Sequence, residues 1–295
     1  MCLPAEHAQL FELGTQAVKQ GDLSAATTYM RRAHAADPTH AATVQILQRL
    51  EQLEPVDADE AVIECCHAIG DGTLSLRTVA AASDVSGATA GVGVWASAPE
   101  LITWLSEAPE APIEGAMTTR RELYADKAVL ELGSGTGYVG IALATLGASR
   151  VCLTDLPQKL PLLKRSLEAN PDIAGEMDAR ILAWGTTGDA YVDGSSFDLL
   201  VASDVTYDAD LVPPLAHSLA SLMKCSYDAG RSPQALLALP QRSHFRPPVT
   251  VDGRVLPDSA LLFQLLRQPG FGSYSTRRLA TIACEPFPVE VWLVE

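Results

Sequence analysis

Apolar residues follow two different spacings along the chain, and the change falls near Ala128. From Gln9 to about Leu53 they recur every three or four residues, which is the spacing of helices that bury one face. Gly21 and Pro38 interrupt this pattern, because glycine and proline break or end helices. The pattern therefore predicts three short helices in the first segment.

Beyond Ala128, short runs of β-branched residues and leucine alternate with helical stretches. Such alternation is typical of parallel strands joined by crossover helices. The predicted strands are residues 129–132, 150–154, 180–182, 197–203 and 235–239, followed by 274–283 and 289–294. No helix separates the last two, so they are expected to pair antiparallel. The predicted fold class is α/β, with a Rossmann-like, seven-stranded, mostly parallel sheet, helices on both faces and an antiparallel last strand. A further strand is expected at 73–79.

The first helices carry small and turn-forming residues in the order used by a tetratricopeptide unit of about 34 residues. These residues are Leu13-Gly14, Gly21-Asp22, Ala26, Ala33 and Asp37-Pro38. The segment resembles one such repeat, but no second copy follows. Since a single repeat cannot bury its own apolar face, it must pack on something else. Two interpretations stay open: a hairpin that caps the main domain, and a unit that binds a partner protein.

The polar, acidic stretch 54–60 suits a boundary between domains. We place the border near residue 58, giving a helical unit at 1–57 and a second domain at 58–295. Residues 87–93 are expected to form a glycine-containing loop that leads to Trp95.

Charge and composition exclude several classes of partner. The chain has 21 Lys plus Arg against 36 Asp plus Glu, a net charge of -15, which opposes binding to nucleic acid. It has no run of about 18 apolar residues, and its N-terminus lacks the pattern of a signal peptide, so no membrane partner is expected. The six cysteines show no metal-ligand spacing. We therefore expect a cytoplasmic protein without a metal site.

A glycine loop follows the first parallel strand, at the edge where open α/β sheets bind ligands. It contains Gly133, Gly135 and Gly137, while position 138, where a dinucleotide fingerprint requires glycine, is Tyr138. This spacing favours S-adenosylmethionine as cofactor, since bare backbone lets its ribose and methionine parts lie close. Glu131, just before the loop, can reach the ammonium of the methionine part directly or through water.

The second strand ends in Asp155. A carboxylate at this position can accept hydrogen bonds from both ribose hydroxyls, because its two oxygens match a cis-diol. The glycine loop alone would be weak evidence. The loop, the acid before it and the acid at the end of the next strand together are strong evidence for the cofactor.

Several stretches carry a likeness to known enzymes: residues 91–98, 131–140, 154–163 with Asn170, 182–185 and 197–208. They resemble the seven-β-strand methyltransferases and, within these, methyltransferase family 16, many of whose members methylate lysines in translation factors, chaperones and calmodulin. The resemblance covers roughly residues 60–295 and leaves the helical unit outside. Its most diagnostic piece is Asp-x-x-Tyr at residues 204–207.

The resemblance implies further site residues. Trp95 would form an apolar wall beside the methionine part of the cofactor, Trp184 would meet the adenine, and Ser203 would line the cofactor site. Asp204 and Tyr207 would be the catalytic residues beside the sulfonium. Each residue also has a purely structural interpretation: Trp95 as a core aromatic, Trp184 as a side chain packed beneath a loop, and Asp204 as a solvent-facing residue at a strand end.

Asp208 is expected to cap the helix that starts near Asp210 rather than to act in catalysis. The histidines are assigned no role.

The implied reaction is displacement of a methyl group from the sulfonium by the neutral amine of a lysine in a cytosolic protein. A lysine ammonium with a pKa near 10.4 must first lose a proton, which desolvation and the adjacent sulfonium favour, so no dedicated base is required. Tyr207 would line the channel and orient the amine. Two alternatives stay open: a small-molecule amine methyltransferase, and a tetratricopeptide-type binding module with an inactive methyltransferase-like domain.

Overall fold

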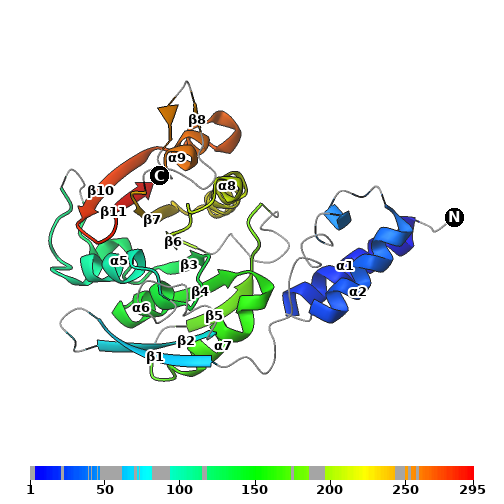
Figure 1. The fold of residues 1–295 in the computed structure, drawn as a ribbon, viewed down its shortest axis with the longest axis horizontal. Coiled ribbons are helices and arrows are strands. Elements are labelled where there is room, and N and C mark those ends of the chain that lie inside the picture. The colour runs from blue at the N-terminus through cyan, green and yellow to red at the C-terminus, as the bar shows by residue number, and fades with distance from the viewer. Residues whose placement is uncertain are drawn as a thin grey trace.

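The computed structural model describes most of the chain. The described residues are 4–20, 23–38, 40, 42–44, 46, 62–69, 72, 74–81, 94–114, 118–173, 176–185, 197–242, 250–251, 254–256 and 259–295. They form a sheet covered by helices, with a helical hairpin to one side (Figure 1). The predicted domain border near 58 and the predicted loop at 87–93 lie outside the described residues, as does most of the third predicted helix.

A seven-stranded sheet with the order β10-β11-β7-β6-β3-β4-β5 forms the centre of the molecule. Its strands are β3 (Ala128–Leu132), β4 (Arg150–Asp155), β5 (Glu176–Ile181), β6 (Leu199–Ser203), β7 (Gln234–Pro240), β10 (Thr276–Ile282) and β11 (Val289–Val294). Strands β3 to β7 pair in parallel, whereas β11 runs antiparallel to both β7 and β10. The predicted fold class is confirmed, including the antiparallel last strand.

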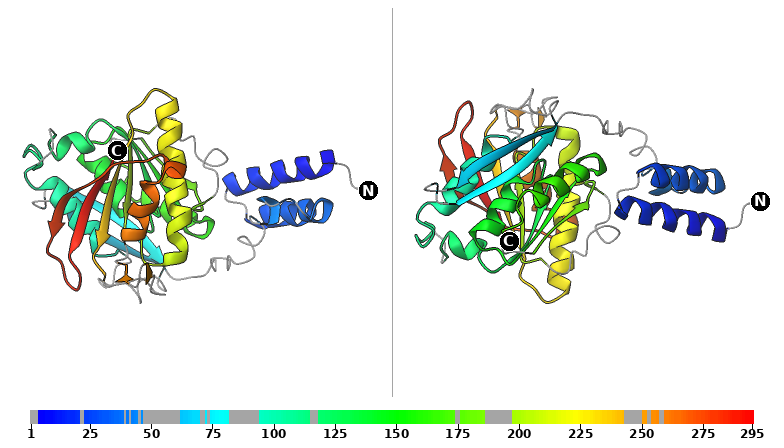
Figure 2. Two further views of the ribbon diagram at one scale, coloured as in Figure 1. Left: turned by 90° about the horizontal axis from the view of Figure 1, so that it is seen from above. Right: turned by 90° about the horizontal axis from the view of Figure 1, so that it is seen from below.

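Helices cover both faces of the sheet (Figure 2). They are α5 (Ser97–Ser106), α6 (Tyr138–Leu146) and α7 (Leu160–Glu168) on one face, and α8 (Val212–Asp228) and α9 (Ala260–Leu266) on the other. Successive residues of a strand point to opposite faces, so Val129 packs with α5 and α6 while Leu130 packs with α8 and α9. Burial on both faces explains why the central strands are almost wholly apolar.

Shorter elements join these layers. They are the 3-10 turns η1 (Arg121–Leu123), η2 (Pro157–Lys159), η5 (Ala209–Leu211) and η6 (Pro269–Phe271), and the short strands β8 (Thr250–Val251) and β9 (Arg254–Val255).

The position predicted for one strand is wrong by several residues. The sequence pattern placed it at 180–182, but β5 runs from Glu176 to Ile181. β5 lies at the edge of the sheet, and its side chains are only partly covered. Asp178 and Arg180 form an ion pair there, with the Asp178 Oδ2 and Arg180 Nε atoms 2.6 Å apart. An apolar pattern detects only the buried end of such a strand.

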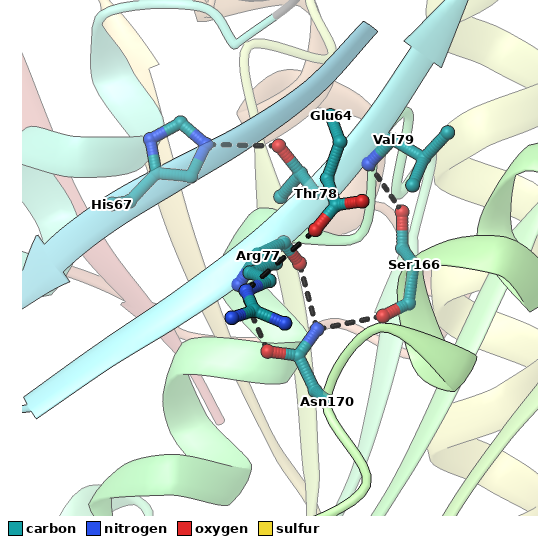
Figure 3. Close-up of polar contacts among 7 residues, drawn as sticks. All are labelled: Glu64, His67, Arg77, Thr78, Val79, Ser166 and Asn170. Atoms are coloured by element: carbon teal, nitrogen blue, oxygen red, sulfur yellow. Dashed lines mark hydrogen bonds and ion pairs between the residues drawn. The ribbon is translucent and has the colours of Figure 1, made fainter. Parts of the chain in front are cut away.

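A β-hairpin lies against α7, built from β1 (Val62–Ile69) and β2 (Leu74–Ala81), which confirms the strand expected at 73–79. Figure 3 shows how two side chains hold the edge of β2. Asn170 Oδ1 accepts from the Arg77 amide at 2.8 Å and Asn170 Nδ2 donates to the Arg77 carbonyl at 2.7 Å. Ser166 Oγ accepts from the Val79 amide at 2.8 Å. These side chains satisfy backbone groups of a strand edge in place of a neighbouring strand.

The N-terminal hairpin consists of α1 (Pro4–Gln20) and α2 (Leu23–Ala36), side by side in Figure 2. A Cβ atom at Gly14 would lie 2.9 Å from Met30 Cε, so glycine lets the helices approach closely. Met30 also belongs to an apolar cluster with Ala17 and two residues of the main domain, Leu160 and Ile181. The hairpin therefore packs on the start of α7 and the end of β5, next to the carboxyl edge of the sheet.

Candidate functional site

The glycine loop after β3 combines two packing positions with one open position. Gly133, Gly135 and Gly137 all have left-handed φ values, of 65°, 56° and 84°. A Cβ atom would lie 2.8 Å from the Trp184 ring at Gly133 and 2.8 Å from Leu153 at Gly137. At Gly135 a Cβ atom would meet nothing within 4 Å. The outer glycines fit the protein's own packing, while Gly135 presents bare backbone to open space.

Hydrogen bonds tie this loop to the end of β4. The Ser134 amide donates to the Thr154 carbonyl at 3.0 Å, and Ser134 Oγ accepts from the Thr154 amide at 2.9 Å. The two oxygens of Asp155 accept from the amides of Gly135 and Leu156, each at 2.7 Å. A carboxylate offers about four acceptor positions. The structure thus brings Asp155 directly beside the open backbone of Gly135, while its predicted contact with the ribose hydroxyls stays a prediction.

Glu131 lies inside the protein, with 3% of its surface exposed. Its Oε2 atom accepts from the Gly140 amide in α6 at 2.9 Å. Burial raises the pKa of this carboxyl to about 8, because the charged form is poorly solvated there. Glu131 therefore links β3 to α6, the two elements that the glycine loop joins. Its predicted contact with a ligand ammonium stays a prediction.

Trp95 and Ser203 come to the same edge from distant parts of the chain. Trp95 precedes α5 and is 49% exposed, so the alternative that it is a core aromatic is wrong. Two residues further on, Ser97 Oγ lies 2.9 Å from Ser203 Oγ at the end of β6. This hydrogen bond fixes the first turn of α5 against the strand that precedes Asp204.

Trp184 packs over the glycine loop, as its closeness to Gly133 shows, and joins the apolar cluster that contains Val205. The next residue is also anchored, since the Gly185 amide donates to Ser218 Oγ at 2.8 Å. The packing interpretation of Trp184 is confirmed. A contact between its ring and an adenine stays a prediction.

Asp204 follows β6 and is turned inward. Its side chain is 8% exposed, so the alternative of a solvent-facing strand end is wrong. Its Oδ1 atom accepts from Arg242 Nη2 at 2.6 Å, and its amide donates to the Ala238 carbonyl at 3.0 Å. Burial raises the pKa of Asp204, and the charge of Arg242 partly opposes that rise. Sequence reasoning did not find Arg242, which stands 38 residues away after β7.

Tyr207 is 52% exposed at the same edge. Burial of its hydroxyl raises the pKa of Tyr207, and the charges of Asp155, Asp208 and Asp204 add to the rise. Its hydroxyl therefore lies in the field of the aspartates at both strand ends. The structure brings the predicted residues of β4 and β6 to one site.

Two neighbours of Tyr207 complete this segment. Asp208 Oδ1 accepts from the Asp210 amide at 2.9 Å, which confirms its predicted role as a cap. Thr206 is fully buried, and its Oγ1 atom finds no hydrogen-bond partner among the described residues. A buried polar atom left in this way is unusual.

Among the described residues, no three or more His, Cys, Asp or Glu side chains gather into a group that could hold a metal ion. The described helices include none with the length and apolar character of a membrane span.

The profile of the family described as "Lysine methyltransferase" matches residues 77–244. Protein-lysine N-methyltransferase EFM6 of Saccharomyces cerevisiae is 34% identical over 112 residues, which are 34% of this chain and 45% of that protein. Protein N-lysine methyltransferase METTL21A of Mus musculus is 40% identical over 95 residues, covering 32% and 43%. EEF1A lysine methyltransferase 3 of Mus musculus is 38% identical over 96 residues, covering 32% and 40%.

The alignments span less than half the length of each of these relatives. The family profile, in contrast, covers more than half of the present chain and includes the glycine loop, Asp155, Asp204, Tyr207 and Arg242. The protein therefore belongs to the lysine methyltransferase family.

Proposed function

We propose that the protein is an S-adenosylmethionine-dependent N-methyltransferase that methylates a lysine side chain of another protein. The observation that carries this proposal is the meeting of open backbone at Gly135, the carboxylate of Asp155 and the Asp204–Tyr207 segment at one edge of the sheet. The names of the relatives, all protein-lysine methyltransferases, support the same activity.

The residues present fit the cofactor. Asp155 places a carboxylate, the group that accepts hydrogen bonds from a ribose cis-diol, beside Gly135, and Gly135 leaves room where a side chain would otherwise stand. The half-exposed ring of Trp95 would shield the methionine part from water. Ser203 and Trp184 would line the remaining walls. When bound, S-adenosylmethionine supplies an electrophilic methyl group on a sulfonium.

The acceptor is expected over β6 and β7, on the other side of β3 from Asp155. Asp204 attracts the lysine ammonium to this side, and the partly buried surroundings favour its neutral form, which is the nucleophile. Tyr207 orients the amine with its ring and hydroxyl, so that the lone pair faces the methyl group. No separate general base is required.

Exposed apolar side chains favour a protein over a small molecule as substrate. Trp95, Leu156 and Tyr207 are each at least 39% exposed and all belong to segments at the carboxyl edge of the sheet. A small-molecule site needs walls that close around the substrate, whereas an open apolar rim suits the aliphatic stem of a lysine on a large partner. The intact loop and Asp155 also favour an active site over an inactive scaffold.

The direct experiment uses radiolabelled S-adenosylmethionine and a total protein extract of the source cells, with mass spectrometry of labelled proteins. The matched control is Gly135→Asn: asparagine tolerates a left-handed φ, but its side chain fills the open space. We expect methyl groups on lysine Nζ with the wild-type protein. The variant should melt near the wild-type temperature, and it should neither bind the cofactor nor transfer methyl groups. Label found only on small molecules, or none despite cofactor binding, would contradict the proposal.

The N-terminal hairpin is a candidate for partner recognition, because it contacts Leu160 and Ile181 next to the carboxyl edge of the sheet, the edge that also carries the candidate site. Removing residues 1–54 should leave cofactor affinity unchanged and weaken turnover of the protein substrate. Full activity would leave only the capping role. An insoluble product would show that the hairpin covers an apolar surface the domain cannot expose.

We place the protein in the cytoplasm. None of the five cysteines among the described residues forms a disulfide, which is the usual state in a reducing compartment.

A further inference from the structure

Arg242 lies outside every sequence motif of the predicted site, yet it forms an ion pair with Asp204 at the end of β6. Its guanidinium pairs with Asp204 at 2.6 Å, and the two side chains are 24% and 8% exposed. Ion pairs on a surface contribute little, but a pair this well covered strongly fixes the charge and direction of both groups.

Backbone contacts hold both partners in place. The Asp204 amide donates to the Ala238 carbonyl in β7 at 3.0 Å, while the Gln241 amide beside Arg242 donates to the Pro288 carbonyl at 2.8 Å. Asp204 has a φ of 56°, a conformation that non-glycine residues adopt only when their surroundings enforce it. The backbone conformation of Asp204 and its contacts with the end of β7 therefore fix the direction of its carboxylate.

One oxygen of Asp204 stays available. Oδ1 is taken by Arg242, whereas Oδ2 accepts no hydrogen bond from the described part of the chain. Burial and the charge of Arg242, just after β7, are the two influences on ionisation of this carboxylate, and they act in opposite directions. Tyr207 is the titratable group nearby, and Asp204, Asp155 and Asp208 all act on its hydroxyl. Without the cation, a buried carboxylate takes up a proton more readily.

We propose that Arg242 is a positioning residue for methyl transfer: it keeps Asp204 ionised and directed so that Oδ2 receives the acceptor amine. This inference rests on the proposed function. In this role Arg242 acts through Asp204 and makes no contact with the cofactor. Lysine at this position would keep the charge, and glutamine would keep only the size and a hydrogen bond.

The test measures kcat/KM for methyl transfer from labelled S-adenosylmethionine to the total protein extract, between about pH 6 and pH 9. For Arg242→Gln, kcat/KM divided by the wild-type value should be low near neutral pH and recover at high pH. The acid limb of the pH profile, where activity falls as Asp204 takes up a proton, should move up by about one to three pH units. Arg242→Lys should restore the limb close to the wild-type position. Taking a ratio cancels the titration of the substrate lysine, which is the same for each enzyme.

Arg278→Gln is the matched control. Arg278 also pairs with a covered carboxylate, that of Glu290, whose side chain is 11% exposed, but it lies on β10 at the far edge of the sheet. For Arg278→Gln, kcat/KM divided by the wild-type value should not change with pH. A flat ratio for Arg242→Gln as well would overturn the inference, since a purely structural defect lowers activity at every pH.

A second measurement is independent of turnover. The carboxyl carbons of labelled aspartates are followed by nuclear magnetic resonance, and the Asp204 signal is identified by its loss in Asp204→Asn. The pKa of Asp204 should be higher in Arg242→Gln than in wild type, and an unchanged value would overturn the inference.

A double variant gives a further test. In the Asp204→Asn background, Arg242→Gln should cause no further loss of activity. If wild type labels no protein, the proposed function fails, while this titration still tests the pair.

Discussion

Two aspartates end two strands of the same sheet, on either side of β3, and their surroundings differ. Asp155 accepts from the backbone amides of Gly135 and Leu156, which are neutral donors. Asp204 is buried and accepts from the Arg242 guanidinium, which is a cation. The two amides fix the direction of the Asp155 carboxylate beside the glycine loop, and a carboxylate held in this way suits hydroxyl groups. Burial raises the pKa of Asp204, and the Arg242 cation opposes that rise. On the proposed function, the same residue type would serve the cofactor at one strand end and the acceptor at the other.

Glu131 lies on β3 between these aspartates and shows what burial does without a cation. Its pKa is raised from 4.5 to about 8, so the folded protein binds a proton that the unfolded chain has lost. This contribution to stability is complete below about pH 4.5 and is lost as the pH rises to about 8. We expect the free energy of unfolding of wild type, relative to Glu131→Gln, to fall by up to about 1.4 kcal/mol per pH unit between those values.

Urea unfolding of both proteins at a series of pH values measures this difference, and other groups cancel because both proteins share them. A difference that does not change with pH would show that Glu131 stays ionised in the folded state.

Tyr207 tests whether the β6 end acts on the acceptor alone. Since half of its surface is exposed, Tyr207→Ala should melt close to wild type and bind S-adenosylmethionine normally. Methyl transfer should fall on the order of a hundredfold, because an amine misplaced by about 1 Å reacts far more slowly. Tyr124→Ala is the contrast: Tyr124 is 1% exposed, and its loss should cost about 3–5 kcal/mol of stability. A large drop in melting temperature for Tyr207→Ala with normal turnover would reverse the assignment.

Much of the cofactor side was predictable from the sequence because its parts are local. Gly135 and Asp155 belong to a strand–loop–helix unit and to the strand that follows, and parallel strands bring their ends together by construction. The cap at Asp208 was predictable for the same reason, since capping involves residues two or three positions apart.

The acceptor side was less predictable, because its contacts join positions far apart. Arg242 meets Asp204 only after a helix and a strand, and no spacing rule links the two. The inward turn of Asp204 depends on its φ value and on the Ala238 carbonyl, neither of which leaves a pattern in sequence. The packing of Trp184 on Gly133 is a similar case, since the ring comes from the turn that follows β5.

Thr206 gives the smallest expected effect. Its buried hydroxyl has no partner among the described residues, so Thr206→Val removes an unsatisfied group while keeping the shape of the side chain. The ligand-free variant should be more stable than wild type by about 1 kcal/mol. If the hydroxyl binds a group of the cofactor or the acceptor, the same variant should also lose affinity for that molecule. Thermal unfolding with and without S-adenosylmethionine separates these effects, and a destabilised ligand-free variant would mean that the hydroxyl is satisfied in solution.

The division between the two strand ends is tested most directly by calorimetric titration of S-adenosylmethionine into Asp155→Ala and Asp204→Asn. Loss of hydrogen bonds to a charged acceptor should weaken binding to Asp155→Ala by about 1.5–3 kcal/mol, roughly a tenfold to hundredfold rise in Kd. Asp204→Asn should bind within about twofold of wild type, because the proposed function assigns this carboxylate to the acceptor and not to the cofactor. An unchanged Kd for a folded Asp155→Ala, or a large loss for Asp204→Asn, would contradict the assignment of the cofactor to β4 and the acceptor to β6.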